Sequence, residues 1–494
     1  MAKRVLFFLL MTYLAVAGGH AYSGDGVLML RVTESMVTRG ETSVRPIEGF
    51  TDYAVAGGQD DALYAKYGLG LSVAAVPLYA VGRSASDWIP DAGLTAFDAP
   101  KILYYDRANK LEVISSFFGT LTNALIMALT MALLALLLID LGLPPRWAAG
   151  WAIAVGLSGV MPFYAKTFFS EPLAGLLLVA CALAIRRAGA ADPGQASPKW
   201  LLFAGFCLGA SALTRVAHLA LAIPALLAFA FWLRAHRKAG HRLMPAAGAV
   251  VLGFAVPCAV LLSYNAVRFG SAFETGYGAE VGAFDTNPIT GLGGLLFSAG
   301  RGLVWYVPWS IAGLLGLRAL FKVDRSMAVF CGGSMATLMA LYSGWHMWEG
   351  GWCFGPRFLV PALPLLAVPA ALFVYERRER PATQLVAALL LAVSGALAFM
   401  SVRVNYIDYH YAIFQTRTDW ESAIRWSLDV APMVRYWDFP LKDFLIMPRF
   451  VTGEGGGFLR ALGVAIVGLW VLAAGLLVSG LRRETAVQPD DAPA

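Results

Sequence analysis

Apolar runs of about 20 residues recur along the sequence, and each is long enough to cross a lipid bilayer as a helix. A crossing needs that length because the hydrocarbon layer is roughly 30 Å thick and each helical residue rises about 1.5 Å. The runs lie near residues 4–21, 113–140, 147–164, 171–186, 244–265, 303–321, 327–343, 357–375, 382–400 and 458–480. Hydrophobic residues make up 58% of the chain, against about 45–50% in a soluble domain. The sequence therefore predicts an all-α polytopic membrane protein.

Two stretches decide the number of crossings. Residues 200–233 would form one helix roughly 51 Å long, so we place two spans there, with Arg215 in the turn "TRVAH" between them. The stretch "YGLGLSVAAVPLYAVG", residues 67–82, would measure only roughly 24 Å and contains glycine and proline. It is therefore predicted to lie at the membrane surface or half inserted, without crossing.

The positions of the basic residues support this assignment, because short cytoplasmic loops of membrane proteins collect Lys and Arg. The basic clusters are "RR" at 186, "RAHRKAGHR" at 234–242, "ERRER" at 376–380 and "RR" at 482. All of them fall on one side only if 200–233 crosses twice and 67–82 does not cross. This arrangement gives about twelve spans with both termini in the cytoplasm. The rival count makes 67–82 a span and 200–233 a single one, which moves the first cluster outside.

The predicted chain is one membrane domain, residues 1–484, followed by a short cytoplasmic tail, residues 485–494. Two external loops are long, the first over 22–112 and a late one over 402–457. The first loop follows residues 4–21, which we interpret as a retained span, with a cleaved secretory signal as the alternative.

The remaining composition argues against several classes of function. The net charge of +6 does not indicate a nucleic-acid partner, because much of the Lys and Arg lies in short clusters between apolar runs. Of the five cysteines, only Cys353 falls in a candidate external loop, so no disulfide framework or thiolate metal site is predicted. The sequence contains no P-loop, HExxH, GxSxG or CxxC arrangement.

Ionisable residues gather at the predicted external ends of the spans. Asp25, in "AYSGDGVLML", follows the first span directly, and the others at span ends are Lys166, Glu171, Arg215, Arg301 and Arg357. Lys66 lies just before the half-inserted segment. An ionised side chain costs about 2.5–3.5 kcal/mol at the centre of a membrane helix, so such residues persist where they line a hydrated cavity or serve function. We therefore predict a shared external cavity for an anionic head group, in which Arg binds phosphate through paired hydrogen bonds.

Structural interpretations of the same residues stay open. Asp25 could cap an amphipathic helix over about 26–38, and Glu171 could cap the helix that follows it. The basic side chains could simply extend to the membrane surface. Trp348, with Glu349 and the two glycines after it, could form a sugar-stacking or lid surface, although an interfacial aromatic belt is the simpler interpretation.

The order of these features resembles that of the GT-C membrane glycosyltransferases, and most of all the branch of protein O-mannosyltransferases and lipid A aminoarabinose transferases. The segment "GDGVLMLRVTESMVTRG" is similar to the start of that family's first external loop, with Asp25 at the acidic position and Gly26 where Glu is usual. The segment "AKYGLGLSVAAVPLYAVG" resembles the family's juxtamembrane lysine segment. "FFSEPLAGLLL" resembles the acidic motif that opens its fourth span, and "GASALTRVAHLALAIP" a recurrent basic turn.

This resemblance implies a GT-C-like fold with juxtamembrane helices in the first external loop. It also implies inverting transfer of a sugar from a polyprenyl-phosphate or diphosphate carrier to a cell-envelope lipid, glycan or protein. The reaction would take place on the external face of the bacterial cytoplasmic (inner) membrane. The implied roles are general base for Asp25, donor-phosphate binding for Lys66, Arg215, Arg301 and Arg357, and substrate binding for Glu171, Lys166, Trp348 and Glu349.

Two chemical expectations accompany these roles. Asp25 lies between two glycines and is expected to be partly dehydrated, which would raise its pKa toward that of a general base. No obligatory cofactor is expected, because Gly26 replaces a second carboxylate and Glu171 alone offers too few oxygen ligands for a strong divalent-cation site.

Other functions remain as alternatives. A transporter or flippase of a lipid-linked saccharide would also present an anion-binding external cavity, but transporters often contain internal repeats and charges near the membrane midplane. No repeat between the halves is evident here, and the charges lie at external ends. A non-catalytic scaffold of envelope synthesis and a polymerase or ligase of surface polysaccharide are the further alternatives.

Overall fold

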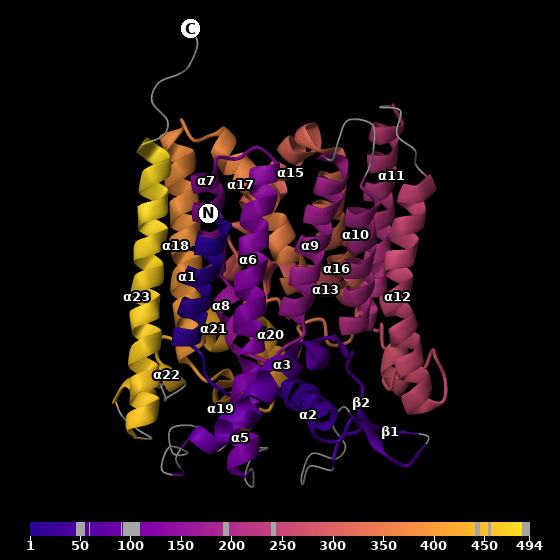
Figure 1. Ribbon diagram of the computed structural model, residues 1–494, viewed down its shortest axis with the longest axis vertical. Coiled ribbons are helices and arrows are strands. Elements are labelled where there is room, and N and C mark those ends of the chain that lie inside the picture. The colour runs from indigo at the N-terminus through magenta and orange to yellow at the C-terminus, as the bar shows by residue number, and fades with distance from the viewer. Residues whose placement is uncertain are drawn as a thin grey trace.

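The protein is an upright bundle of helices with a layer of shorter elements at its foot (Figure 1). The computed structural model describes residues 1–45, 55–58, 60–89, 91, 109–190, 197–238, 244–439, 445–452 and 456–486. The helices of the bundle are α1 (Ala2–Ala15), α6 (Thr122–Asp140), α7 (Pro145–Gly156), α8 (Met161–Lys166), α9 (Glu171–Ala190), α10 (Pro198–Thr214), α11 (Ala222–Lys238), α12 (Met244–Phe269), α15 (Ser310–Val323), α16 (Arg325–Ser343), α17 (Leu363–Glu376), α18 (Pro381–Arg403) and α23 (Gly457–Ala486).

The elements at the foot come from the two long loops predicted from the sequence (Figure 1). The first loop supplies α2 (Gly24–Thr38), β1 (Val55–Gly57), β2 (Leu63–Ala65), α3 (Gly70–Ala85), η1 (Ser86–Trp88) and α5 (Lys110–Thr120). The late loop supplies α19 (Tyr406–Thr416), α20 (Trp420–Trp426), η6 (Leu428–Val430), α21 (Pro432–Arg435) and α22 (Ile446–Thr452). Strands β1 and β2 pair antiparallel, with Val55 opposite Ala65. Short connecting helices are η3 (Val216–Leu221), η4 (Gly278–Gly282), α13 (Pro288–Phe297), α14 (Leu303–Tyr306) and η5 (Arg357–Ala362).

Within the described residues, eight helical segments are long and apolar enough to cross a membrane. Other predicted spans are shorter or broken helices: residues 147–164 divide into α7 and α8, and 303–321 divide into α14 and α15. The all-α polytopic class is thus confirmed, whereas the count of about twelve crossings stays a prediction. Of the predicted tail, 485–494, residues 487–494 lie outside the described part of the chain.

The helical stretch over residues 200–233 is interrupted at Arg215, where its length predicted a turn. Helix α10 ends at Thr214, and Arg215 adopts an extended conformation (φ −146°, ψ 117°), which ends the α-helical hydrogen bonding. The chain then continues through η3 into α11. The predicted turn at Arg215 is therefore confirmed.

The stretch 67–82 becomes α3, which lies beside α2 and α5 at the foot of the bundle (Figure 1). Helix α3 has 16 residues and contains Pro77, so it is short for a crossing. Its position agrees with the prediction of a juxtamembrane helix.

Burial separates the centre of the bundle from its periphery. In the segment Arg357–Glu376, which forms η5 and α17, 89% of the apolar window is buried, against 22% in α12 and 17% in α23. Since α12 and α23 expose apolar side chains such as Val251 and Val471, these faces are suited to contact lipid. Segment 357–376 is therefore the central element, and its first residue, Arg357, lies at the candidate site.

Candidate active site

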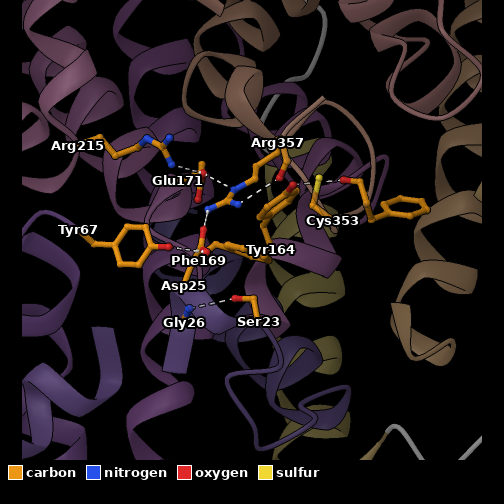
Figure 2. A network of polar contacts seen from close by, with 12 residues as sticks. Ser23, Asp25, Gly26, Tyr67, Tyr164, Phe169, Glu171, Arg215, Cys353 and Arg357 are labelled. Carbon is orange, nitrogen blue, oxygen red and sulfur yellow. Dashed lines mark hydrogen bonds and ion pairs between the residues drawn. The ribbon is translucent and has the colours of Figure 1, made fainter. Parts of the chain in front are cut away.

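Asp25 lies in the first turn of α2, and its carboxylate points toward Arg357 (Figure 2). Oδ2 lies 2.6 Å from Nη2 of Arg357, and Oδ1 accepts a 2.7 Å hydrogen bond from the Tyr67 hydroxyl. Ser23 caps the helix, because its hydroxyl accepts a hydrogen bond from the backbone N–H of Gly26. The interpretation of Asp25 as the helix cap is therefore wrong.

Glu171 begins α9 and is completely buried. Its Oε1 accepts hydrogen bonds from Nε of Arg357 at 2.7 Å and from Nη1 of Arg215 at 2.5 Å. Arg357 therefore bridges two carboxylates, those of Asp25 and Glu171 (Figure 2). A buried carboxylate that receives two charge-assisted hydrogen bonds holds both guanidinium groups in fixed directions. Four of the predicted site residues thus meet in one cluster.

The electrostatics of Asp25 differ from the expectation. Burial raises the pKa of its carboxyl, but the positive charge of Arg357, hydrogen bonds from Tyr67 and Arg357, and the charge of Arg215 together outweigh burial. The pKa of Asp25 therefore lies below its ordinary value. The predicted rise was wrong because the sequence indicated dehydration but did not show which cation the carboxylate faces.

Arg215 is the basic residue of the cluster that keeps most of its donors open. In the described part of the chain, one of its five N–H groups is hydrogen-bonded, to Glu171. Its guanidinium lies 5.1 Å from the ring centre of Phe358 and 6.0 Å from that of Tyr342. The buried Tyr342 hydroxyl has no hydrogen-bond partner among the described residues. Because 18% of the Arg215 side chain is exposed, a ligand can reach it.

Lys66 lies next to Tyr67 and forms an ion pair with a different acid. Its ammonium donates hydrogen bonds of 2.7 Å and 2.9 Å to the two carboxylate oxygens of Glu280. It also lies 5.0 Å from the ring centre of Tyr277. Glu280 is 44% exposed, so the lysine is near the cluster but engaged by a surface carboxylate.

Two residues of this region were not predicted. Tyr67 adjoins Lys66 in the quoted segment "AKYGLG", which is the only signal that could have identified it. Arg268, at the end of α12, donates a 2.5 Å hydrogen bond to the carbonyl of Ala65, the last residue of β2. This bond holds the strand that leads directly into Lys66 and Tyr67.

Arg301 lies outside this cluster, and its N–H groups are largely occupied. This corrects its predicted role in binding the donor phosphate. Arg301 is completely buried, and four of its five N–H groups have partners within the protein. Nε donates to the carbonyl of Glu349 and Nη1 to that of Gly300, while Nη2 donates to the carbonyl of Gly351 and to Nε2 of His410. One free N–H cannot form the paired hydrogen bonds with which Arg binds phosphate.

Three predicted substrate-binding residues are also engaged elsewhere. Lys166 is buried and donates a 2.6 Å hydrogen bond to the carbonyl of Val402. Trp348 is buried and packs 5.5 Å from Trp426, so it offers no open stacking face. Glu349 is buried and pairs with Arg425 at 3.0 Å. These positions do not support the predicted sugar-stacking or lid surface.

The donor set at the site is poor for a metal ion. Across the ranges that the structure describes, no group of three or more His, Cys, Asp or Glu side chains is placed to hold one. Asp25 and Glu171 are both paired with Arg357. A Cβ at Gly26 would come within 2.7 Å of the Phe168 carbonyl oxygen, so no second acidic side chain fits after Asp25. Independence from divalent cations stays a prediction.

Two open grooves lie outside the cluster. One, of about 630 Å³, is lined by residues 40–42, Tyr64 and the 259–267 part of α12. The other, of about 540 Å³, lies between α3, Trp88 and Phe458. Neither contains a predicted site residue, so the predicted shared cavity is not one of these grooves.

A similar architecture occurs in solved structures of other proteins. ArnT from Cupriavidus metallidurans bound to undecaprenyl phosphate matches 94% of this chain and 77% of its own, with 13% identity and a TM-score of 0.50. The oligosaccharyltransferase from Archaeoglobus fulgidus in complex with Zn and sulfate matches with 14% identity and a TM-score of 0.50. That match covers 87% of this chain and 57% of the archaeal one. No protein-family model matches the sequence, and the comparison with curated proteins found no match.

The chain therefore has the fold of the GT-C membrane glycosyltransferases, as the order of its motifs predicted. At identities of 13–14%, the similarity establishes the fold. A fold alone does not specify a substrate or a reaction.

Proposed function

We propose that this protein is a membrane glycosyltransferase that moves a sugar from a polyprenyl-phosphate or diphosphate carrier to a cell-envelope acceptor, with inversion. The observation that carries the proposal is the cluster of Asp25, Arg357, Glu171 and Arg215 at the foot of a GT-C fold. It combines a carboxylate base with a guanidinium that a phosphate can reach. The carrier is inferred from this chemistry and from ArnT, a protein of the same fold that was solved with undecaprenyl phosphate.

The orientation in the membrane follows from α9. This helix begins at Glu171 in the cluster and has 20 residues, so its other end lies about 30 Å away. Arg186 and Arg187 occupy that far end. Because basic residues favour the cytoplasmic side, we infer that the cluster faces the exterior, which in a bacterium is the periplasmic face of the inner membrane.

Asp25 is the proposed general base. With its pKa held below the ordinary value, the carboxylate is ionised at neutral pH and able to accept a proton. Arg357 and Tyr67 each engage one oxygen, and a carboxylate oxygen can accept more than one hydrogen bond. As the acceptor oxygen bonds to the anomeric carbon, its proton passes to Asp25 and the bond to the carrier phosphate breaks.

The carrier phosphate leaves with the bonding electron pair, so its growing negative charge needs cations. Arg215 is the proposed principal ligand, because most of its N–H groups have no partner among the described residues and part of its side chain is exposed. Lys66 is the proposed second ligand, released from Glu280 when the phosphate binds. Attack on the anomeric carbon opposite to the leaving phosphate inverts its configuration. No acid is needed to protonate the leaving group, since cations stabilise it directly.

Glu171 and Arg357 are proposed as positioning residues. Glu171 orients Arg215 and Arg357 together, and Arg357 holds the carboxylate of Asp25. Glu171 thus links the proposed phosphate ligand to the arginine that holds the proposed base. Substituting Glu171 is therefore expected to disturb both functions.

The direct test is to incubate the purified protein with a panel of polyprenyl-phosphate sugars and measure released polyprenyl phosphate. The wild-type protein is expected to release carrier from at least one donor in the presence of its acceptor. Asp25→Asn is expected to reduce the rate by a factor of about 10²–10⁴, the usual contribution of a general base, while remaining monodisperse in detergent. A transporter would move the donor across a liposome membrane without breaking the sugar–phosphate bond. Wild-type activity that survives Asp25→Asn would contradict the assigned base.

A further inference from the structure

The turn Glu349–Gly351 is held between two buried arginines. The carbonyls of Glu349 and Gly351 accept hydrogen bonds from Arg301, at 3.1 Å and 2.9 Å. The carbonyl between them, on Gly350, accepts a 3.2 Å hydrogen bond from Nη1 of Arg357. Gly350 and Gly351 both have positive φ (84° and 70°), a conformation that costs other residues energy. Successive carbonyls therefore point alternately to Arg301 and Arg357.

His410 completes the environment of Arg301 from the late external loop. Its Nδ1 lies 2.7 Å from the carbonyl of Tyr406, one turn earlier in α19. A carbonyl only accepts, so Nδ1 carries the proton and Nε2 is the acceptor for Nη2 of Arg301, 3.1 Å away. The ring also stacks on Trp352, with centroids 5.8 Å apart. His410 therefore contacts both the arginine and the chain just after the turn.

The charge state of His410 agrees with this geometry. Burial, and then the neighbouring charge of Arg301, lowers the pKa of His410 to about 3. The imidazole is therefore neutral, and its Nε2 keeps the lone pair that the arginine requires.

We propose that Arg301 and His410 are positioning residues for the transfer reaction, acting through the Glu349–Gly351 turn on Arg357 and through Arg357 on Asp25. The proposal rests on the proposed function for its activity readouts. It also gives the late external loop a role in positioning the active site, because His410 in α19 supplies the acceptor that orients Arg301. Neither Arg301 nor His410 has to touch substrate.

A consequence for Asp25 distinguishes this role from a general structural one. The groups that face Asp25 include Arg357 from η5, Tyr67 before α3 and the more distant charge of Arg215. The hydroxyls of Tyr277 and Tyr406 also interact with its charge. Arg357 contributes both charge and a hydrogen bond that lower the pKa of Asp25. If the turn loses its hold on Arg357, the pKa of Asp25 rises, and the acid limb of the activity profile moves to higher pH.

The experiment compares variants at position 410. His410→Phe keeps an aromatic ring for Trp352 but removes the acceptor for Arg301. His410→Gln replaces that acceptor, since its amide oxygen can occupy the place of Nε2. His236→Phe is the matched control, because His236 also has Nδ1 beside an i−4 carbonyl, that of Trp232, and stacks on that tryptophan, but lies in α11.

His410→Phe is expected to lower kcat roughly 10- to 100-fold, the effect of misplacing a reacting group by up to about 1 Å. The KM for the donor should change little, and the acid limb should shift upward. His410→Gln should restore most of the activity and the wild-type pH profile, and His236→Phe should match the wild type in both. An activity loss in His410→Phe that is equal at every pH and not restored by His410→Gln would overturn the proposal.

A measurement without substrate separates this proposal from the proposed function. Thermal unfolding in detergent is followed for the wild type, His410→Phe, Asp25→Asn and the double variant at pH 7. If the two residues are coupled through Arg357, the losses of melting temperature in the two single variants should not add in the double variant. The effects of independent sites would add. Non-additive losses of melting temperature in a protein without transferase activity would refute the proposed function but support the positioning role of Arg301 and His410. Additive losses of melting temperature in an active enzyme would refute the positioning role but leave the proposed function standing.

Discussion

Asp25 and Arg357 are 332 residues apart in the chain, and their side chains form a 2.6 Å ion pair. This pair joins the first external loop to the start of the most buried segment of the bundle. A buried ion pair is stable only when the remaining hydrogen-bonding groups of both partners are satisfied. Here Tyr67 also donates to Asp25, and Glu171 and the Gly350 carbonyl accept further N–H groups of Arg357. The candidate site therefore forms only when distant parts of the chain have packed together.

The low pKa of Asp25 makes a prediction about pH. Because its folded-state pKa lies below that of the unfolded chain, Asp25 stabilises the fold at every pH above the ordinary value of about 3.9. That stabilisation is lost as the pH falls further, through the folded-state pKa. We therefore expect the difference in melting temperature between the wild type and Asp25→Asn to stay constant from about pH 7 to pH 5 and to shrink below about pH 4.

Differential scanning fluorimetry in detergent at fixed ionic strength measures this difference. Asp285→Asn serves as the control, since Asp285 is an exposed carboxylate, and the melting temperature of this variant should track that of the wild type. A difference that already shrinks between pH 7 and pH 5 would show that the pKa of Asp25 is raised, in conflict with the geometry.

A second prediction concerns Glu171. Glu171→Gln keeps the size of the side chain but removes the charge that faces both Arg215 and Arg357. Breaking a buried ion pair from one side costs about 3–5 kcal/mol, so the melting temperature should fall markedly and transfer should be lost. Glu112→Gln is the control, because Glu112 is partly exposed and 3.8 Å from Arg31, a contact worth about 0–1 kcal/mol. Equal melting temperatures for the two variants would exclude a central role for Glu171.

Much of the architecture could be predicted from the sequence because its physical cause is local. The turn at Arg215 follows from the length of residues 200–233 against the thickness of a bilayer. The juxtamembrane position of α3 follows from its shortness and from the distribution of basic residues. The gathering of Asp25, Glu171 and Arg357 follows from the cost of leaving charges at the ends of apolar helices without partners.

The roles of individual charges could not be predicted, because they depend on which atoms each side chain meets. Arg301 and Arg357 both follow glycine-containing segments at predicted external ends. Arg301 is surrounded by backbone carbonyls, whereas Arg357 meets two carboxylates. The folded positions of distant elements separate the two cases, because α2 and α9 supply the carboxylates that Arg357 meets. The pKa of Asp25 was misjudged for the same reason, since burial and a facing cation have opposite effects.

The tight packing at Gly26 makes a third prediction. A Cβ at this position would lie 2.7 Å and 2.8 Å from the carbonyl oxygens of Phe168 and Ala21, distances that require the backbone to move. Gly26→Ala should therefore lower both the melting temperature and the transfer rate, although alanine normally favours a helix. Gly150→Ala, in α7 with open space around its Cβ, should be neutral or slightly stabilising. A fully active and stable Gly26→Ala protein would mean that this segment is looser than the structure shows.

The ion pair between Lys66 and Glu280 makes the last prediction. Since Glu280 is 44% exposed, the pair contributes only about 0.2–1 kcal/mol, which a phosphate can overcome. Glu280→Gln should therefore lower the KM for the donor by up to about five-fold without changing kcat, because the lysine no longer has to leave a carboxylate before it binds phosphate. Asp285→Asn removes an exposed charge from the same external segment and should leave KM unchanged, which excludes a general effect of surface charge. Steady-state kinetics at low and high salt measure both variants. A donor KM that rises in Glu280→Gln would instead make Glu280 a substrate ligand and remove Lys66 from the phosphate site.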